Sequence, residues 1–575
     1  MNLTNFFYCV YDSHLLDHHL QFLVIDQGVV KDQLSFRCFF KKLRAEGVQM
    51  KEVKQLQQKY KDGEISRRDF VKAVGALGIS ATAAGGLLTS AQALAATPRK
   101  GGTARYANNM HGPDDQMDPI VFTSGIDYTR GICTYNGLIQ ILDDMSLHPE
   151  LAEEWSSNAN ATAFTFKIRK GVKFHDGSRL TADDVVWSMS RHLGKDSPSV
   201  AKAFFANVID WVKVDSYTVK AYLSSPDSDM PIKLGEKQCK IVKKDTVDFT
   251  KGNGTGPFRL ESFEPGVKSL HVRNEDYWRE GANFDSIELT AITDPIARLN
   301  ALIAGNVDLI NQVDAKGIKL VKRSPGVQLM SVPSGLYGGI CCLKNTAPGK
   351  SDDFVKGMQY IQDRERIVRS IIKGHGMVGN DHPISPAYGA DHCHELPQRV
   401  YDPDKAKYHL KKSGYSSAEL YVAPVTVGIE DACLMMQNNL KKIGFDLSIK
   451  KVPTDGYWGA VWMKEPMNVV TWNMRPTANA MMAIQFAPGG AWNDTFWNNE
   501  RFGQLLKLSL AETDSAKRHE MHCEMQTLVH NGSGMVIPYH VNIVDAHTKR
   551  LKGMKNVPLG SLGAYTWPEF AWFAS

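Results

Sequence analysis

The feature that most restricts the fold is a unit that recurs in the second half of the chain: an amphipathic helix, a glycine and a short strand. Residues 432–443 carry apolar side chains at helical spacing, Gly444 follows them, and residues 447–449 alternate as a half-buried strand does. Asp402-Pro403 supplies a cap and a first-turn proline to another helix, which Gly414 ends. Helices are also predicted over 295–304, before Gly305, and over 354–372, before Gly374. Helices that alternate with short strands predict an α/β fold.

The region N-terminal to these units also carries short-range sequence signals for strands and helices. Residues 163–169 alternate strictly between apolar and polar side chains, which predicts a half-buried strand. Thr181 stands three residues before Asp184, a spacing at which the two can cap a helix reciprocally. The glycine-rich run 252–257 has the composition of a phosphate loop, but it has no lysine at the P-loop position, and Pro257 lacks an N–H. We therefore predict a turn at this run.

An export signal precedes the α/β region. Arg67 and Arg68, with Phe70 two residues later, stand before an uncharged stretch from 73 to 96 that ends in small residues. This pattern is typical of a twin-arginine signal peptide, which we predict over 50–95. A stretch of this length could also anchor the chain in a bilayer, but its glycine and hydroxyl side chains favour a cleaved signal. The residues after it are therefore expected in the periplasm.

Residues 1–49 lie upstream of that signal and show no sustained hydrophobic period. Met50 opens a polar, helix-prone run that leads directly into the arginine pair. We interpret residues 1–49 as a spurious or disordered N-terminal extension. A genuine additional segment is the alternative.

The region after the signal is almost neutral. Residues 1–95 hold 12 of the 67 Lys and Arg and 9 of the 62 Asp and Glu, which leaves 55 against 53, a net charge of +2. Interspersed charges of both signs argue against a nucleic-acid partner. About 480 residues are too many to fold around a single hydrophobic core, so two or three domains are expected. Seven cysteines remain without C-x-x-C spacing, and their pairing stays open.

Several motifs in this region follow one another in a recognisable order. Residues 173–177 read KFHDG, and further motifs cover 181–185, 254–258, 273–278, 302–308, 401–406 and 442–445. Together they resemble the family 5 extracytoplasmic solute-binding proteins, the dipeptide-, oligopeptide- and nickel-binding components of ABC importers. The resemblance extends over essentially residues 101–575.

This resemblance implies an α/β fold of the two-lobe periplasmic binding protein type (type II, venus-flytrap) with an inserted third subdomain. Lobe I would comprise residues 96–145, 245–341 and 541–575, the insertion 146–244, and lobe II 342–540. A ligand would lie between the lobes, which close around it by hinge motion. The implied partners are a small-molecule solute, an inner-membrane ABC permease and, during export, the twin-arginine translocase.

An enzyme and a metal carrier are the alternatives to a solute binder. The chain has neither G-x-S-x-G nor H-E-x-x-H, so we predict no catalytic residue and no cofactor. His392, Cys393 and His394, beside Asp391 and near His382, could bind nickel, copper or zinc if their side chains converged. Consecutive residues of an extended chain point to opposite sides, which favours a solvated loop over a metal site. A nickel or metal-chelate binder of the same fold remains the alternative function.

The candidate ligand residues follow from an aromatic-rich segment between 457 and 497, of which at least half is expected to be core. Within it, residues 472–477 correspond to the family's ligand loop, where peptide binders carry an aspartate for the ligand's ammonium group. Here no acidic residue occurs from 466 to 493, and Arg475 is the only charged residue. A guanidinium suits a carboxylate or phosphate. We expect Arg475, Trp472, Asn473 and Trp492 to contact the ligand; an ion pair of Arg475 within its own lobe is the alternative.

A second loop, residues 379–384, contributes the remaining candidates. Asp381 is the acidic residue that could meet a ligand ammonium, and His382 follows it. The combined interpretation is a periplasmic protein that binds a peptide-like or opine-like solute bearing a carboxylate and delivers it to an importer.

Overall fold

The structure is a computed structural model that describes residues 100–110, 112, 115–453, 457–490 and 492–574. These belong to one compact unit, residues 98–575. The predicted extension 1–49 and signal 50–95, with Arg67, Arg68 and Phe70, lie outside the described residues. Among the described residues, no helix has both the length and the apolar character needed to cross a membrane.

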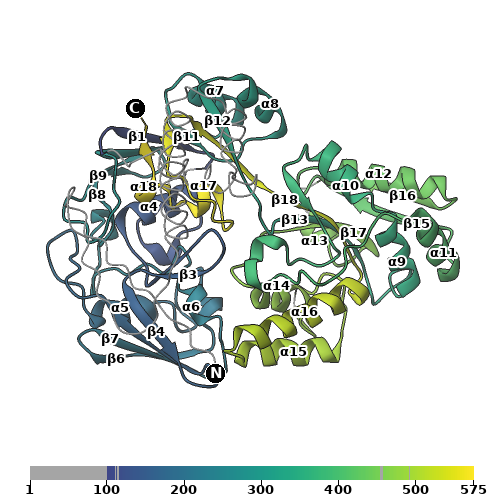
Figure 1. The fold of residues 1–575 in the computed structure, drawn as a ribbon, viewed down its shortest axis with the longest axis horizontal. Coiled ribbons are helices and arrows are strands. Elements are labelled where there is room, and N and C mark those ends of the chain that lie inside the picture. The colour runs from purple at the N-terminus through teal and green to yellow at the C-terminus, as the bar shows by residue number, and fades with distance from the viewer. Residues whose placement is uncertain (1–99, 111, 113–114, 454–456, 491, 575) are drawn as a thin grey trace, which may run out of the picture. The chain divides into compact units, whose positions relative to one another are not determined.

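Lobe I is built on a seven-stranded sheet of order β12-β19-β11-β1-β10-β9-β8 (Figure 1). Its strands are β1 (Thr103–Asn108), β8 (Phe258–Glu264), β9 (Lys268–Arg273), β10 (Ser286–Ala291), β11 (Leu309–Ile310), β12 (Val327–Val332) and β19 (Ile543–Thr548). Strand β1 pairs in parallel with β10 and β11, and the other pairings are antiparallel. Trp567, fully buried, packs with Tyr106 of β1 and Phe284 in the core of this lobe.

Helices and short strands complete lobe I. They are η1 (Pro119–Val121), α4 (Gly125–Thr134), β2 (Ile139–Ile141), β3 (Leu147–Pro149), α7 (Pro295–Ile303), α8 (Ala315–Arg323), β20 (Leu551–Lys552), α17 (Ser561–Ala564), α18 (Trp567–Phe570) and β21 (Trp572–Phe573). The predicted helix over 295–304 is thus present as α7, with the Asp294 side chain accepting from the Ala297 N–H at its start.

A separate four-stranded antiparallel sheet of order β4-β5-β7-β6 forms the inserted subdomain. Its elements are β4 (Ala152–Ser157), β5 (Ala163–Ile168), α5 (Ala182–Ser190), η2 (Lys202–Phe205), β6 (Val208–Asp215), β7 (Thr218–Leu223), α6 (Met230–Lys233) and η3 (Phe249–Lys251). Phe164, Phe166 and Ile168 of β5 are buried, as the alternation predicts. Thr181 and Asp184 form the predicted capping box at the start of α5.

Lobe II is built on a six-stranded sheet of order β14-β18-β13-β17-β15-β16. Its strands are β13 (Tyr337–Cys342), β14 (Gly376–Val378), β15 (Ser417–Val422), β16 (Asp446–Lys451), β17 (Met467–Trp472) and β18 (Met535–Val541). Its helices are α9 (Asp352–Tyr360), α10 (Arg364–Arg366), η4 (Ile367–Ile371), η5 (Pro386–Asp391), α11 (Pro403–Ser413), α12 (Ile429–Lys442), α13 (Tyr457–Ala460), α14 (Ala478–Phe486), α15 (Glu500–Ala511) and α16 (Ser515–Gly532). The two-lobe α/β architecture is confirmed.

Helices cover both faces of the lobe II sheet (Figure 1). Ile340 and Cys341 are neighbours along β13, yet they belong to two different buried clusters, because successive strand side chains point to opposite faces. Helices α9, α11 and α12 contribute to the cluster with Ile340, and α14, α15 and α16 contribute to the one with Cys341. Burial on both faces explains why β17 is apolar for most of its length.

The chain passes between the lobes at two points. Strand β12 of lobe I ends at Val332 and β13 of lobe II begins at Tyr337, while Asn542 alone separates β18 from β19. The predicted boundary at 341–342 therefore falls at the end of a lobe II strand, and the switch occurs several residues earlier. Motif spacing does not reveal it, because β12 and β13 are both short apolar strands.

One predicted helix is divided. The apolar stripe over 354–372 predicts a continuous helix, but α9 ends at Tyr360 and a new helical segment begins after Asp363. Asp363 has non-helical backbone angles, and its side chain accepts a hydrogen bond from the Arg366 N–H. A side chain that caps a new helix start competes with continuation of the old helix, so the apolar periodicity persists across a break.

The glycine-rich run 252–257 bends into strand β8, in keeping with the predicted turn, and lies against the end of α4. The Gly256 N–H donates to the Thr134 carbonyl oxygen at 2.9 Å. A Cβ atom on Gly254 would lie 2.0 Å from that same oxygen. Glycine is therefore required here by the close approach of two backbones, and not by a phosphate.

This close approach gives a stability prediction. Gly254→Ala should lower the free energy of unfolding by about 1–3 kcal/mol, the usual cost of overpacking a tight contact. Gly326→Ala is the matched control, because a Cβ atom there would meet no other atom within 4 Å and its φ is not positive. Urea unfolding followed by circular dichroism measures both. Equal stability of the two variants would contradict the contact.

Candidate functional site

The predicted ligand loop connects strand β17 to helix α14 in lobe II. Trp472 ends β17, and Thr477 caps α14 by accepting a hydrogen bond from the Ala480 N–H. Asp391 adds a second acceptor, since its Oδ2 receives the Ala478 N–H at 3.1 Å. The strand end and the doubly capped helix start hold the intervening residues 473–476 between two fixed points.

This loop contacts lobe I directly. Met474 packs in a cluster whose other members come from lobe I and its inserted subdomain: Ile141, Met145, Leu147, Ile232, Val557, Leu559 and Ala564. The Thr477 hydroxyl donates to Asp229 Oδ2 at 2.5 Å, and Asn479 Nδ2 donates to Asp229 Oδ1 at 3.4 Å. Burial, and secondarily the charge of Asp391, raises the pKa of Asp229 above its ordinary value. The loop therefore lies at the junction of the lobes.

Arg475 stands between these two contacts, and within the part of the chain that the structure describes it has no acidic partner. Its backbone N–H donates to the Tyr388 hydroxyl at 3.1 Å, and its guanidinium carbon lies 5.7 Å from the centroid of a Trp472 ring. Its Nε is buried without a hydrogen-bond partner, and no carboxylate among the described residues forms an ion pair with it. The alternative role, an ion pair within lobe II, is therefore not observed. A half-buried guanidinium in this state is suited to receive an anion.

Trp472 is held in place by Asp494. The Trp472 indole N–H donates to Asp494 Oδ2 at 2.7 Å, and the Trp462 indole N–H donates to Oδ1 at 2.6 Å. Gln485 adds a third donor to Oδ2 at 2.7 Å. Burial raises the pKa of Asp494 to about 6, although these three donors oppose the shift. Trp472 is thus a fixed platform beneath Arg475.

Sequence reasoning did not identify Asp494 as part of the site. The signal was present, because Asp494 is the first acidic residue after the acid-free stretch 466–493. A carboxyl that is buried among indole and amide donors cannot be recognised from the sequence, because only tertiary packing brings those donors to it.

Asn473 and Trp492 are exposed next to this platform. Trp492 keeps 48% of its surface exposed, and its ring centroid lies 5.9 Å from that of Trp472. Trp492 also approaches Trp462, which in turn approaches the half-exposed Trp458. Asn473 is exposed within the loop itself. Both residues are accessible to a ligand, and their role stays a prediction.

Asp381 does not occupy the position expected from the sequence. It is 0% exposed and forms ion pairs with Arg364 and Arg399, while its Oδ1 accepts the Ile537 N–H. Burial alone would raise the pKa of Asp381, but the two guanidinium groups outweigh it and the pKa is lowered. The prediction that Asp381 is available to a ligand ammonium is wrong, because its charge is already neutralised inside lobe II.

His382 is also buried. It is 1% exposed, and neither ring nitrogen has a hydrogen-bond partner among the described residues. Burial, followed by the nearby His392 and His540, holds the pKa of His382 well below its ordinary value. A neutral imidazole inside lobe II does not face solvent, so the expected ligand contact of His382 is not observed.

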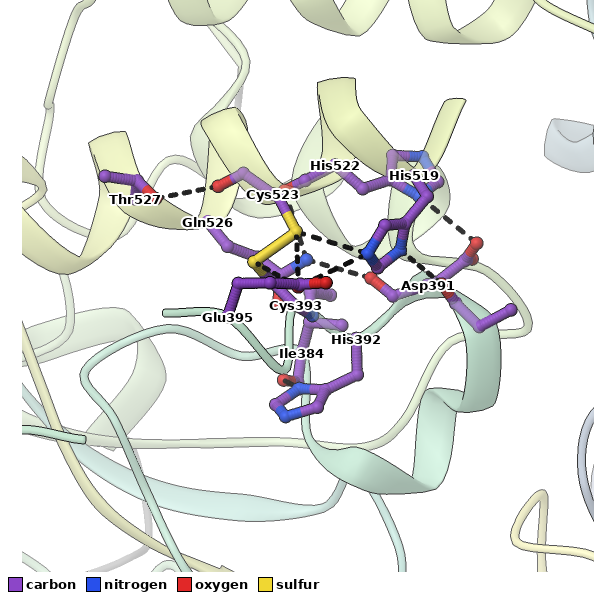
Figure 2. Close-up of a disulfide and its surroundings, with 11 residues drawn as sticks. Ile384, Asp391, His392, Cys393, Glu395, His519, His522, Cys523, Gln526 and Thr527 are labelled. Carbon is purple, nitrogen blue, oxygen red and sulfur yellow. Dashed lines mark hydrogen bonds and ion pairs between the residues drawn. A yellow bond between two sulfur atoms is a disulfide. The ribbon is translucent and has the colours of Figure 1, made fainter. Parts of the chain in front are cut away.

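The histidine–cysteine loop is solvated at His394, as predicted, but not at Cys393. Cys393 is buried and forms a disulfide with Cys523 of helix α16 (Figure 2). The His392 Nδ1 atom lies 2.8 Å from the Ile384 carbonyl oxygen, and no metal-binding group found among the described residues includes His392 or His394. The three side chains therefore do not converge, and the cysteine has a partner 130 positions away.

Comparison with known proteins identifies what the chain is similar to. The model of the bacterial extracellular solute-binding proteins, family 5 Middle, matches residues 146–495. Heme-binding protein A of Haemophilus influenzae is 25% identical over 486 residues, covering 77% of this chain and 88% of that protein. The dipeptide-binding protein of Escherichia coli K12 is 24% identical over 494 residues, covering 78% and 91%. The solved structure of HbpA2 from Haemophilus parasuis superposes with a TM-score of 0.73 at 22% identity, covering 82% of this chain and all of that one.

The shifted pKa of Asp494 gives a pH prediction. In an unfolded chain an aspartate titrates near 3.9, whereas in the fold Asp494 keeps its proton up to about pH 6. Its contribution to stability is therefore complete below about pH 4 and is lost as the pH rises through 6. Because Trp462 and Trp472 bond to this carboxyl, tryptophan fluorescence should titrate with a midpoint near pH 6.

Asp494→Asn should abolish that titration, and Asp446→Asn, at an exposed position of the same lobe, should leave it unchanged. Fluorescence emission recorded between pH 4 and 8 compares the three proteins. A midpoint that persists in Asp494→Asn would assign the titration to another group.

Proposed function

We propose that this protein serves an ABC importer as the component that captures solute outside the cytoplasm. The proposal starts from family membership, because the chain belongs to the bacterial extracellular solute-binding proteins of family 5. The solute is a small molecule bearing a carboxylate, peptide-like or opine-like. It is held between the two lobes and delivered to the membrane permease. The cycle consists of binding and release and involves no covalent step.

The observation that carries this proposal is Arg475. It lies between Met474, which packs on lobe I, and Thr477, which bonds to Asp229 of the inserted subdomain of lobe I. It has no acidic partner among the described residues, and Trp472 supports its guanidinium group. A ligand carboxylate would supply the missing anion in a bidentate arrangement.

The acidic residues near the loop support an anionic ligand group over a cationic one. Asp494 is occupied by two indoles and an amide, and Asp381 is occupied by two arginines. Asp229 accepts from Thr477 and Asn479. A ligand ammonium would therefore find no free carboxylate among these, and burying it unpaired would cost several kcal/mol.

The names of the relatives agree with this chemistry and leave the rest of the ligand open. One relative is a heme-binding protein and another a dipeptide-binding protein, at nearly equal identity. Heme carries propionates and a dipeptide carries a terminal carboxylate, so both offer an anion to a guanidinium. A nickel or metal-chelate ligand, the alternative, gains no support from His392 and His394, which join no metal-binding group among the described residues.

Lobe closure follows from the same arrangement. Only residues 333–336 and Asn542 carry the backbone between the described parts of the lobes, so rotation about these two segments opens and closes the site. A ligand that contacts both lobes shifts the population toward the closed form, which the permease would recognise.

Arg475 variants test the proposed ligand chemistry. The ligand is first identified by mass spectrometry of small molecules released from denatured protein. Arg475→Ala should then cost about 2–5 kcal/mol of binding free energy by titration calorimetry, as for one partner of a buried charge pair. Arg475→Lys should recover only part of this loss, because an ammonium lacks the planar fork.

Arg501→Ala is the matched control, since Arg501 is an exposed lobe II arginine paired with Glu524. Its affinity should equal that of the unmodified protein. If Arg475→Ala lowers the melting temperature and leaves affinity intact, Arg475 has a structural role and the proposed ligand contact is wrong.

We also propose export by the twin-arginine translocase, from the pattern at Arg67, Arg68 and Phe70. Replacing both arginines by lysine should leave the precursor in the cytoplasm, because the translocase recognises the pair. Cell fractionation and immunoblotting measure this. Deletion of residues 2–49 is the control and should change neither export nor binding. Normal periplasmic accumulation of the double lysine variant would refute the route.

A further inference from the structure

The Cys393–Cys523 disulfide and two neighbouring side chains, His519 and Glu395, bring four potential metal ligands together outside the ligand loop. His519 and Cys523 stand one helical turn apart on α16, and Cys393 and Glu395 lie on the loop beneath it (Figure 2). Glu395 Oε2 lies 3.4 Å from each sulfur atom, and His519 Nε2 lies 3.5 Å from the Cys523 sulfur and 3.4 Å from Glu395 Oε2. Thiolate, imidazole and carboxylate are the ligand types that zinc uses.

The loop is attached to helix α16 independently of the disulfide. The Cys393 N–H donates to Gln526 Oε1 at 3.0 Å, and Gln526 Nε2 donates to the Asp391 carbonyl oxygen at 2.8 Å. His522 Nδ1 lies 3.1 Å from Asp391 Oδ1. Breaking the sulfur–sulfur bond would therefore leave both thiols close to each other and to Glu395, with His519 beside Cys523.

His519 has the orientation of a metal ligand. Its Nδ1 atom lies 2.8 Å from the Ala390 carbonyl oxygen, which can only accept, so Nδ1 carries the hydrogen. The Nε2 lone pair of the neutral ring is then directed toward Cys523 and Glu395. A backbone carbonyl that fixes the tautomer in this way is the usual support of a zinc-bound histidine.

We propose that the reduced protein binds one zinc-type divalent ion through Cys393, Cys523, His519 and Glu395. An external dithiol reduces the disulfide, giving two thiols and its own disulfide in a two-electron exchange. Each cysteine thiol then releases its proton to solvent as the metal binds. In the reverse exchange an external disulfide accepts two electrons and is reduced to its two thiols, the Cys393–Cys523 bond re-forms and the ion is released, so the same residues hold either a disulfide or a metal.

The site is accessible and chemically selective. The Glu395 side chain is 71% exposed and that of His519 is 30% exposed, so an ion can enter from solvent. The other cysteines of the described residues, Cys133, Cys239, Cys341, Cys342 and Cys433, are buried and free. Burial raises the pKa of each of these five thiols. They are therefore poor competitors for a metal.

Cobalt is the probe for this site. The purified exported protein is reduced with dithiothreitol, freed of reductant without oxygen and titrated with Co²⁺. We expect one equivalent to bind with a thiolate-to-cobalt charge-transfer band and the intense visible bands of tetrahedral coordination. The oxidised protein should show neither band, and zinc should displace the cobalt. Reduced protein without a thiolate–cobalt band would overturn the proposal.

Variants assign the ligands. Cys523→Ser should remove most of the charge-transfer band. His519→Ala should weaken cobalt binding by at least about tenfold to a hundredfold, which is the loss seen when a residue that only hydrogen-bonds to a metal ligand is removed. His394→Ala is the matched control: it removes an exposed histidine beside Cys393 and should change nothing. If His394→Ala abolishes binding, or Cys523→Ser leaves the band intact, the assignment is wrong.

A measurement on the unmodified protein covers the case in which a variant fails to fold. Zinc should protect Cys393 and Cys523 together from iodoacetamide in the reduced protein, as read by peptide mass spectrometry. Alkylation of both cysteines at the same rate with and without zinc would also overturn the proposal.

Discussion

Two backbone segments, residues 333–336 and Asn542, determine how this protein can work, because they alone join the described parts of its two lobes. They are linked through the residues that flank them: Asn542 Nδ2 donates to Ser331 Oγ at the end of β12, and the Val541 N–H donates to the carbonyl oxygen of Leu336. All other contacts between the lobes are made by side chains or single backbone groups, which can separate without unfolding either sheet. The candidate ligand loop makes several of these separable contacts, through Met474 and Thr477.

Three of the motifs that carry the family resemblance hold the inserted subdomain and lobe I together. The ring nitrogens of His175 in the KFHDG motif lie 3.2 and 3.0 Å from the carbonyl oxygens of Gly252 and Gly256. Asn274 of a third motif donates to the same Gly256 oxygen. Such residues identify the fold. We propose that ligand chemistry resides in the loop that contains Arg475, where the sequence departs from the peptide-binding pattern.

Candidate site residues were predictable to the extent that their role was local. Arg475 is conspicuous as the only charge in a long stretch, and the structure adds that it lacks an acidic partner among the described residues. Asp381 looked equally available, yet Arg364 and Arg399 enclose it. Arg364 precedes Asp381 and Arg399 follows it, each by fewer than twenty positions in the chain. Nothing in this spacing indicates that the fold buries the three side chains together. Asp494 was overlooked for the same reason, since its partners are indoles brought to it by packing.

The sequence by itself determined the α/β class, the two-lobe fold and many element boundaries, such as the capping box at Thr181 and the helix between Pro403 and Gly414. These depend on short-range physics: hydrophobic period, caps and glycine stops act over a few residues. Only the tertiary structure decided the partners of Asp381, Asp494 and Cys393 and the position of the first crossover. Those outcomes depend on which distant side chains meet in a buried environment, as Cys393 meets Cys523 across 130 positions, and local propensity carries no information about such encounters.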